Sequence, residues 1–282
     1  GIVDEVIIVV GYKKELIKKH IGNKYKNIRV RYVEQKQQLG TGNAMLMAEK
    51  YIKNEFISLY GDDIYSKKDF KNVIKNKYSI LTKKVENPQL FGVILEKNKI
   101  LTDLIEKPKK FISNLVNTGL YKLDKKIFVL LKKLKKSKRN EYELTDAVKD
   151  LSKDERINCV ISECWLPIVY PLDLLKADRA LRKNKIIIGK NSKIYGKIQN
   201  STIGDDCVIK GNVKNSIVMD KTIIGKNSII EESVIGEKVY FSGRASWAVI
   251  ADNSKLFKVV VKNDCKISPN RLIKNKIIEH DV

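Results

Sequence analysis

Residues 217–236 read IVMDKTIIGKNSIIEESVIG, and an isoleucine recurs every six positions in this stretch, at Ile217, Ile223, Ile229 and Ile235. Because the faces of an α-helix repeat about every 3.6 residues, a period of six excludes a helix. The period is typical of a hexapeptide β-helix, in which each short strand contributes one inward aliphatic side chain. A series of ordinary hairpins is the alternative, but the register holds over several steps and favours the β-helix. Shorter stretches of the same rhythm occur at Ile188 and Ile194, and at Ile203 and Ile209.

Upstream of this repeat, apolar strands alternate with amphipathic helices. Residues 2–10 form a continuous apolar strand that ends at Gly11, and residues 13–20 then carry Leu16 and Ile17 at helical spacing. A continuous apolar strand predicts burial on both faces, as in a parallel sheet between helices. The alternation predicts an α/β doubly wound domain. Further strands are expected at 28–34, 56–60, 79–85, 92–96, 101–106 and 117–122, with helices at 42–52, 68–75, after 124, at 144–152 and within 173–182.

The composition describes a globular protein. The 282 residues include 56 Lys and Arg against 33 Asp and Glu, for a formal net charge of +23, and 43% of them are hydrophobic. These values exclude a disordered tail and a disulfide-framed miniprotein. At roughly 150 residues per domain, the length predicts two domains, each large enough to bury its own core.

The densest basic run, KKLKKSKR at residues 132–139, has two interpretations. One is a patch that binds nucleic-acid phosphates, which needs aromatic residues or a groove-reading motif nearby, and neither accompanies the run. The other is a solvated helix face, because Leu130, Leu131 and Leu134 sit at helical spacing among the lysines. We favour the solvated face and expect no nucleic-acid partner, since lysines spread through the whole chain.

The cysteines and the absence of long apolar runs bear on the compartment. Cys159, Cys164, Cys207 and Cys265 show no CxxC pairing, so we expect reduced structural thiols rather than a zinc site. No run of about 18 apolar residues and no charged-then-apolar leader is present, which predicts neither a membrane span nor a signal peptide. The expected compartment is the cytoplasm.

Three groups of residues combine glycine, acid and amide groups at expected strand ends, where open α/β sheets bind ligands. Residues 34–44, EQKQQLGTGNA, let the backbone approach a ligand ring or phosphate, although a plain turn and helix cap is the alternative. Residues 56–63, FISLYGDD, deliver two carboxylates suited to Mg²⁺, or else a turn. Residues 103–108 and 116–121 offer a carboxylate, an amine and an amide to a sugar and its phosphate.

Taken in order, these motifs resemble those of a known family. The chain resembles a sugar-1-phosphate nucleotidyltransferase fused to a left-handed hexapeptide β-helix, as in archaeal bifunctional enzymes and the bacterial relatives that make activated N-acetylglucosamine. The resemblance implies a Rossmann-like α/β nucleotidyltransferase domain over residues 1–182 and a left-handed parallel β-helix over residues 183–282. The motifs that carry it are QLGTG at 38–42, LYGD at 59–62, EKP at 106–108, NTG at 117–119, EYELTD at 141–146 and YPLDLL at 170–175.

The resemblance also implies a reaction and its site residues. The reaction is transfer of a nucleotidyl group from UTP or dTTP to a hexose 1-phosphate, glucose or N-acetylglucosamine, with Mg²⁺ as the cofactor and pyrophosphate as the leaving group. The implied catalytic residues are Asp62, which binds Mg²⁺, and Lys107, which approaches the sugar phosphate. The implied nucleotide-binding residues are Gln35, Gly40, Thr41, Tyr60 and Gly61, and the implied sugar-binding residues are Gly92, Glu106, Asn117 and Thr145.

The chain departs from the family pattern at two places. Gly1 corresponds to a point just before the family's second strand, and neither GxGxxG nor GxxxxGK[ST] occurs in the sequence. We therefore expect an incomplete triphosphate site, a sheet without a central strand, and little turnover by this chain alone. In addition, Pro167 stands where many relatives place an acid soon after the tryptophan. The second magnesium ligand is thus unassigned, and Asp173 is either that ligand or a cap for the helix from Leu174.

The β-helix has a second possible role, acyl transfer from coenzyme A with a histidine as the general base. The only histidines, His20 and His280, lie outside the six-residue repeat, so we favour an oligomerisation or regulatory module, with a homotrimer as the expected assembly. An acyltransferase remains an alternative. Another is a split, non-catalytic subunit that binds sugar phosphate.

Overall fold

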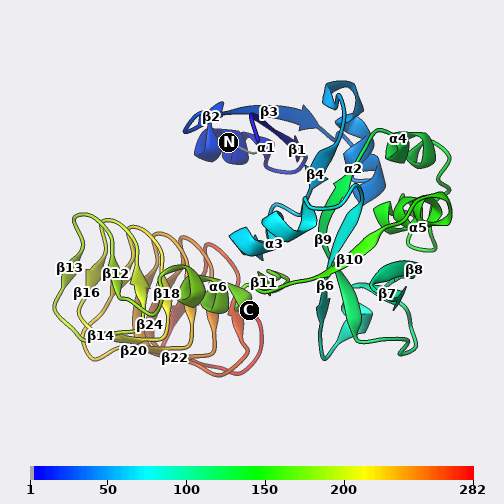
Figure 1. The fold of residues 1–282 in the computed structure, drawn as a ribbon. Coiled ribbons are helices and arrows are strands. Elements are labelled where there is room, and N and C mark those ends of the chain that lie inside the picture. The colour runs from blue at the N-terminus through cyan, green and yellow to red at the C-terminus, as the bar shows by residue number, and fades with distance from the viewer. Residues whose placement is uncertain (1–2) are drawn as a thin grey trace. The chain divides into compact units, whose positions relative to one another are not determined.

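The computed structural model describes residues 3–282 of the chain, which form two compact units (Figure 1). The first unit holds the residues up to Gly61 together with Tyr65–Trp165, and the second holds Asp62–Ile64 together with Leu166–Val282. β5 (Ile64–Tyr65) and β11 (Trp165–Leu166) lie where the chain passes from one unit to the other. Ile2, the predicted start of the first strand, lies outside the described residues. The predicted domain boundary between residues 182 and 183 stays a prediction.

The first unit contains a three-stranded sheet with the order β1-β3-β2. β1 (Glu5–Val10) and β3 (Ile28–Glu34) are parallel, and β2 (Lys24–Tyr25), which was not predicted, runs antiparallel to β3. The prediction that the first strand is buried on both faces is wrong for the described residues. Of β1 only Val10 is buried, because the strand stands at the end of its sheet.

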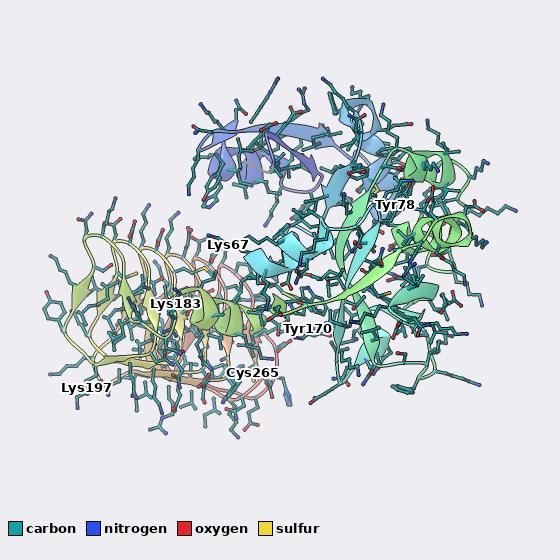
Figure 2. The ribbon with its side chains drawn as sticks, viewed as in Figure 1. Lys67, Tyr78, Tyr170, Lys183, Lys197 and Cys265 are labelled. Carbon is teal, nitrogen blue, oxygen red and sulfur yellow. The ribbon has the colours of Figure 1, made fainter. Side chains whose placement is uncertain are left out.

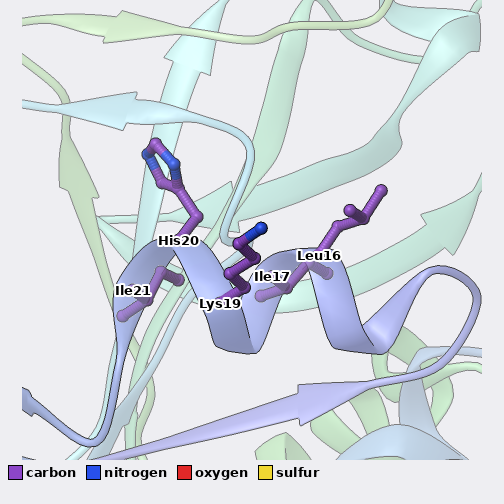
Figure 3. Close-up of a pocket in the computed structure, with 5 residues that line it drawn as sticks. All are labelled: Leu16, Ile17, Lys19, His20 and Ile21. Carbon is purple, nitrogen blue, oxygen red and sulfur yellow. The ribbon is translucent and has the colours of Figure 1, made fainter.

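The helix after β1 covers little of this sheet. α1 (Lys14–Ile21) has no buried residue, and Leu16 is 61% exposed. One side of α1 opens on a hollow of about 650 Å³, lined by Leu16, Ile17, Lys19, His20 and Ile21 (Figure 3). None of the predicted site residues lines this hollow.

A second, six-stranded sheet forms the centre of the first unit, with the order β4-β9-β6-β10-β8-β7. Of its strand pairs only β6 with β10 is parallel, so the sheet is mixed rather than the predicted parallel one. The strand pairs β7–β8 and β6–β9 are antiparallel. The strands are β4 (Phe56–Ser58), β6 (Ser79–Lys84), β7 (Gly92–Lys97), β8 (Ile100–Glu106), β9 (Leu115–Leu123) and β10 (Asn158–Ile161).

Helices pack on the six-stranded sheet through their apolar sides. α5 (Leu144–Asp154) buries Leu144, Ala147, Val148 and Leu151, which recur at helical spacing and join the main core of the first unit. Ser66 caps α3, with its hydroxyl accepting from the Asp69 N–H while the Asp69 carboxylate accepts from the Ser66 N–H. The other helices are α2 (Thr41–Met47), η1 (Glu49–Tyr51), α3 (Lys67–Val73), η2 (Pro88–Leu90) and α4 (Lys126–Leu131).

The basic run at residues 132–139 does not form the predicted helix face. α4 ends at Leu131, and the lysines follow in a turn and in a stretch without regular secondary structure. Leu130 and Leu134 still pack against the core, and Lys132 pairs with Glu49 at 2.5 Å. Lysine side chains extend from the surfaces of both units, including Lys67, Lys183 and Lys197 (Figure 2).

The second unit is a solenoid of short parallel strands that follows α6 (Asp173–Leu181), consistent with a left-handed β-helix (Figure 1). Successive coils pair in register, as in Ile187 with Thr202 and Ile217 with Val234, in steps of 15 and 17 residues. The strands are β12 (Ile187–Ile188), β13 (Lys193–Ile194), β14 (Ile198–Gln199), β15 (Thr202–Ile203), β16 (Val208–Ile209), β17 (Asn212–Lys214), β18 (Ile217–Val218), β19 (Ile223–Ile224), β20 (Ile229–Glu231), β21 (Val234–Ile235), β22 (Tyr240–Ser246), β23 (Val249–Ile250), β24 (Lys255–Val261), β25 (Lys266–Ile267), β26 (Leu272–Lys274) and β27 (Ile277–Ile278).

The structure corrects which isoleucines point into the coils. Ile223 is 39% exposed whereas its neighbour Ile224 is fully buried, and Ile230 rather than Ile229 is buried in the next strand. Successive side chains of a strand point to opposite faces, so a repeat can be followed in either row. Coils of 15 and 17 residues are shorter than three full six-residue repeats, so a strict six-residue spacing does not stay in one row. Ile235 pairs with the buried Val218 and lies in the buried row, whereas Ile217 lies outside that row.

Candidate functional site

The turn after β3 holds the first predicted group, the nucleotide-binding residues. The half-buried Gln35 amide donates from Nε2 to the Gly40 carbonyl at 3.1 Å and to Asn43 Oδ1 at 2.8 Å. Gly40 has φ 103° and ψ 172°, a conformation that is essentially confined to glycine. Gln35 and Gly40 therefore belong to one hydrogen-bonded turn, as predicted, and α2 begins directly after it.

A segment distant in sequence fastens this turn. The Gly42 N–H donates to the Tyr142 carbonyl and the Tyr142 N–H donates to the Leu39 carbonyl, both at 2.8 Å. The Thr41 hydroxyl accepts from the Leu144 N–H at 3.1 Å. A Cβ on Gly40 would lie 2.7 Å from the Tyr142 carbonyl oxygen, so the close approach also requires glycine. The EYELTD motif thus holds the predicted base-binding turn in place.

Three of the predicted sugar-binding residues meet at the end of β8. The Thr145 hydroxyl, at the start of α5, donates to Glu106 Oε2 at 3.1 Å. A Cβ on the buried Gly92 would lie 3.1 Å from the same oxygen and 3.2 Å from the Thr145 methyl. Gly92 therefore leaves room for the Glu106 carboxylate, whose other oxygen can accept hydroxyl protons of a ligand.

Arg139 and Glu143, which were not among the predicted site residues, complete this corner. The Arg139 guanidinium pairs with Glu106 Oε1 at 3.5 Å, with Glu141 at 3.4 Å and with Glu143 at 3.6 Å. Glu143 is almost fully buried and accepts from the Ser137 hydroxyl at 2.9 Å. The signal that could have revealed them is the sequence RNEYE itself, where one arginine lies beside two acids directly before a predicted helix.

Burial raises the pKa of the Glu106 carboxyl above its ordinary value. The Glu143 charge adds to this rise, whereas the hydrogen bond from Thr145 and the charges of Lys107 and Arg139 oppose it. Glu106 is thus a partly desolvated carboxylate whose charge depends on its neighbours. Such groups are typical of binding and catalytic sites.

The remaining predicted residues of the first unit lie on β8, β9 and the turn after β4. Lys107 is exposed, has φ 40°, and donates its N–H to the Phe91 carbonyl at 3.1 Å, which fixes the backbone while the side chain stays in solvent. Asn117 lies in β9 and is 5% exposed. The ring of Tyr60 packs on Gly119, where an added Cβ would lie 2.2 Å from Tyr60 Cδ2.

The predicted metal ligand Asp62 belongs to the second unit, directly after Gly61, and its side chain is exposed. Asp63 Oδ1 accepts from the Ile168 N–H at 3.3 Å, which leaves Asp62 as the carboxylate directed to solvent in this pair. Residues 3–282 contain no group of three or more His, Cys, Asp or Glu side chains arranged to hold a metal. One exposed carboxylate fits Mg²⁺, which commonly takes one or two carboxylates together with waters and substrate phosphates.

Asp173 has a structural role in the second unit. Its Oδ2 accepts from the backbone N–H groups of Val169 and Tyr170, at 3.0 and 2.7 Å. These donors precede α6, so the side chain stabilises the turn before the helix rather than its first turn. The prediction that Asp173 caps the helix from Leu174 is therefore wrong, because α6 begins at Asp173 itself and has no side-chain cap hydrogen bond.

The cysteines and histidines lie apart from these groups. Cys159, Cys207 and Cys265 are buried, Cys164 is exposed, and all four are free thiols. His20 lies on α1, and His280 follows β27. Within residues 3–282, each helix is too short or too polar to cross a membrane.

Comparisons with known proteins agree with this architecture. The family model described as "Nucleotidyl transferase" matches residues 1–184, and the one described as "GlmU-like, C-terminal hexapeptide" matches residues 184–275. The bifunctional protein GlmU of Methanocaldococcus jannaschii is 39% identical over 216 residues, which are 75% of this chain and 49% of that protein. The bifunctional protein GlmU of Methanococcus aeolicus is 35% identical, over 100% of this chain and 78% of that protein.

The chain therefore spans about half the length of the M. jannaschii relative. Among solved structures, a UDP-glucose pyrophosphorylase complexed with UDP-glucose matches with a TM-score of 0.57 and 24% identity, covering 64% of this chain and 82% of that one. This similarity concerns the fold. The matching regions, the ordered motifs and the shared architecture agree: the chain belongs to the nucleotidyl transferase family and carries a GlmU-like hexapeptide region.

Proposed function

We propose that this protein transfers a nucleotidyl group from UTP or dTTP to a hexose 1-phosphate, either glucose or N-acetylglucosamine, and releases pyrophosphate. The observation that carries the proposal is the convergence of Glu106, Thr145 and Gly92 in one corner, together with the turn at Gly40 that the following EYELTD segment fastens. A carboxylate and an amide suit sugar hydroxyls, and a glycine turn suits a flat base. The name of one relative, the bifunctional sugar-1-phosphate nucleotidylyltransferase/acetyltransferase of Sulfurisphaera tokodaii, which is 31% identical over 96% of this chain, supports the same reaction.

In this proposal each side chain has one task. Glu106 and Asn117 hold the sugar hydroxyls, Lys107 neutralises the sugar phosphate, and the turn of Gln35 and Gly40 holds the base. A sugar phosphate is already ionised and needs no general base, so the residues accelerate the reaction mainly by positioning and charge neutralisation. Mg²⁺ bound by Asp62 would supply neutralisation of the triphosphate charge.

Pyrophosphate release and ligand binding test the proposal together. We expect titration calorimetry to detect binding of UDP-glucose or of a sugar 1-phosphate. We also expect pyrophosphate release from UTP or dTTP to require Mg²⁺. Failure to bind any nucleotide sugar or sugar 1-phosphate would overturn the proposal.

Asp62→Asn tests the metal assignment. In a protein that also carries the family's Gly-rich loop, turnover should fall by about two orders of magnitude, because the variant removes the charge that would hold the cation and this is the scale of losing a charge-stabilising group at a reacting phosphate. Asp173→Asn is the matched control, since its carboxylate stabilises the turn before α6. Full turnover in Asp62→Asn would remove Asp62 from the site.

We also propose that the hexapeptide region assembles copies of the chain, with a trimer as the expected state. Aliphatic side chains stand on its outside, including Ile223, Leu272 and Ile277, which are 39%, 64% and 58% exposed. Sedimentation at micromolar concentration should show an oligomer, and Leu272→Lys should shift it toward monomer. A monomeric wild-type chain would contradict this proposal.

A further inference from the structure

β9 contains a bulge at the NTG motif. Tyr121 pairs with Ile80 of β6 and Asn117 pairs with Thr82, so the three residues from Thr118 to Leu120 stand opposite Leu81 alone. Gly119 has φ 81°, and the Thr118 hydroxyl donates to the Leu81 carbonyl at 3.1 Å. Bulges of this kind redirect side chains and are frequent beside active sites. Here the bulge lets the Asn117 amide contact two later residues of the same strand, Gly119 and Tyr121.

Both ends of the Asn117 amide are hydrogen-bonded within β9. The Gly119 N–H donates to Asn117 Oδ1 at 2.8 Å, and Asn117 Nδ2 donates to the Tyr121 hydroxyl oxygen. A backbone N–H can only donate, so the group that faces it must be the amide oxygen. The amide orientation follows from this pairing, and the nitrogen must face Tyr121.

The Tyr121 side chain, which accepts this hydrogen bond, is fully buried, both ring and hydroxyl. Burial raises the pKa of the Tyr121 hydroxyl well above its ordinary value, with a contribution from Tyr60, so the hydroxyl stays neutral near physiological pH. A neutral hydroxyl oxygen accepts the Nδ2 hydrogen without a charge. Tyr60 covers Gly119 and Tyr65 donates to the Thr118 carbonyl at 2.7 Å, so tyrosines enclose the bulge.

We propose that Tyr121 is a positioning residue that fixes the Asn117 amide so that the second Nδ2 hydrogen is presented to the sugar. With one Nδ2 hydrogen on Tyr121, the second Nδ2 hydrogen is the one left to donate to a ligand, while the Gly119 N–H holds the oxygen end in place. The ligand group that meets this hydrogen is an acceptor, either a sugar hydroxyl oxygen or an N-acyl carbonyl oxygen. Glu106, which accepts, contacts hydroxyl protons in the same ligand. This inference rests on the proposed sugar-binding function.

A double-mutant cycle in the full chain tests the role of Tyr121. Titration calorimetry with glucose 1-phosphate and with N-acetylglucosamine 1-phosphate gives the affinity of the wild type, Tyr121→Phe, Asn117→Ala and the double variant. We expect Tyr121→Phe to weaken binding roughly 3- to 10-fold, the effect of one misplaced hydrogen bond. In the Asn117→Ala background it should change affinity by less than about twofold. Asn117→Asp, which can no longer donate, should bind as weakly as Asn117→Ala.

Tyr78→Phe is the matched control. Tyr78, labelled in Figure 2, is also buried. Its hydroxyl donates to Asp124 rather than to the bulge. Its removal should leave sugar affinity unchanged. A panel of monodeoxy glucose 1-phosphates then locates the acceptor: the analogue that loses affinity with the wild type but not with Asn117→Ala lacks the oxygen that Asn117 contacts.

The outcomes separate this inference from the proposed function. If no sugar 1-phosphate binds the wild-type chain, the proposed function fails. If sugar binds but Tyr121→Phe leaves affinity unchanged, or weakens it equally with and without Asn117, Tyr121 has no positioning role. Coupling between the two residues, with Tyr78→Phe silent, supports the assignment.

Discussion

Ser201, Ser216 and Ser233 of the hexapeptide unit lie in successive coils, and each hydroxyl accepts the N–H of the residue one coil further on. In the first unit, by contrast, Glu106 meets Thr145 and Arg139, which lie 39 and 33 residues away. The serines repeat one interaction at steps of 15 and 17 residues. In the solenoid each coil is stabilised by interactions with its neighbouring coils, whereas the contacts of Glu106 depend on a single arrangement of distant residues.

The buried row of the solenoid should show the largest effect. Ile224→Ala removes a fully buried side chain and should cost about 2–5 kcal/mol of unfolding free energy, because the cavity it leaves cannot close completely. Ile223→Ala, its neighbour in the outward row, is the control and should cost much less. The chain has two tryptophans, so in a Trp165→Phe background all tryptophan fluorescence comes from Trp247 of the second unit. Denaturant unfolding followed by this fluorescence then reports on that unit. Equal losses for the two variants would reverse the row assignment.

The fastened turn in the first unit should show the next largest effect. Gly40→Ala places a Cβ 2.7 Å from the Tyr142 carbonyl oxygen in a conformation confined to glycine, so it should cost roughly 1–3 kcal/mol. Gly61→Ala has open space around its Cβ and serves as the stability control. Thermal unfolding and hydrogen exchange at residues 141–144 measure the change. An undisturbed 141–144 segment in Gly40→Ala would show that the two segments are not coupled.

Loss of one serine hydrogen bond between successive coils should show a smaller effect. Ser216→Ala leaves the buried Ser233 N–H without its side-chain acceptor at 3.0 Å and should cost about 1–2 kcal/mol. Ser242→Ala, whose hydroxyl accepts from the exposed Lys258 N–H at 2.9 Å, should cost less. Hydrogen exchange of the Ser233 amide reports the loss directly. If both variants lose the same free energy of unfolding, burial does not set the strength of these hydrogen bonds.

The smallest expected change in stability concerns the charge of Glu106. Burial raises its folded-state pKa, so the folded protein binds this proton more tightly than the unfolded chain, and stability falls as the pH rises from the ordinary value of 4.5 through the raised pKa. Glu106→Gln lacks this loss and should be the more stable variant at neutral pH. Unfolding of the two proteins between about pH 4 and 8 measures the difference, which should vanish at the acid end.

The same pKa shift predicts how sugar binding depends on pH. As the pH falls, Glu106 takes up a proton and no longer accepts fully from sugar hydroxyls, so affinity should drop at a higher pH than an ordinary glutamate would cause. Calorimetric titration of sugar 1-phosphate across the acidic range tests this. A flat profile in the wild type, or the same profile in Glu106→Gln, would show that the charge of Glu106 does not control binding.

The sequence by itself determined the two architectures and most of the elements. Strand Ile28–Glu34 was predicted with its exact bounds, and the six-residue rhythm indicated the solenoid, because both depend on side-chain patterns between near neighbours. The ordered motifs also identified Glu106 and Thr145, which the structure brings together. The sequence did not show which isoleucine row is buried, since two adjacent rows of a strand carry the same residue type.

Only the tertiary structure decided how the site is held. The Arg139 contact to Glu106 and the bonds between Tyr142 and the Gly40 turn join residues that no local pattern connects. The Asn117 contacts to Gly119 and Tyr121 are local in sequence, but the bulge that allows them forms where β9 pairs with β6. The same holds for the two sheets of the first unit, because strand order depends on which distant segments pair. Local sequence sets periodicity and turns, whereas pairing over long distances sets the charges and hydrogen bonds of a site.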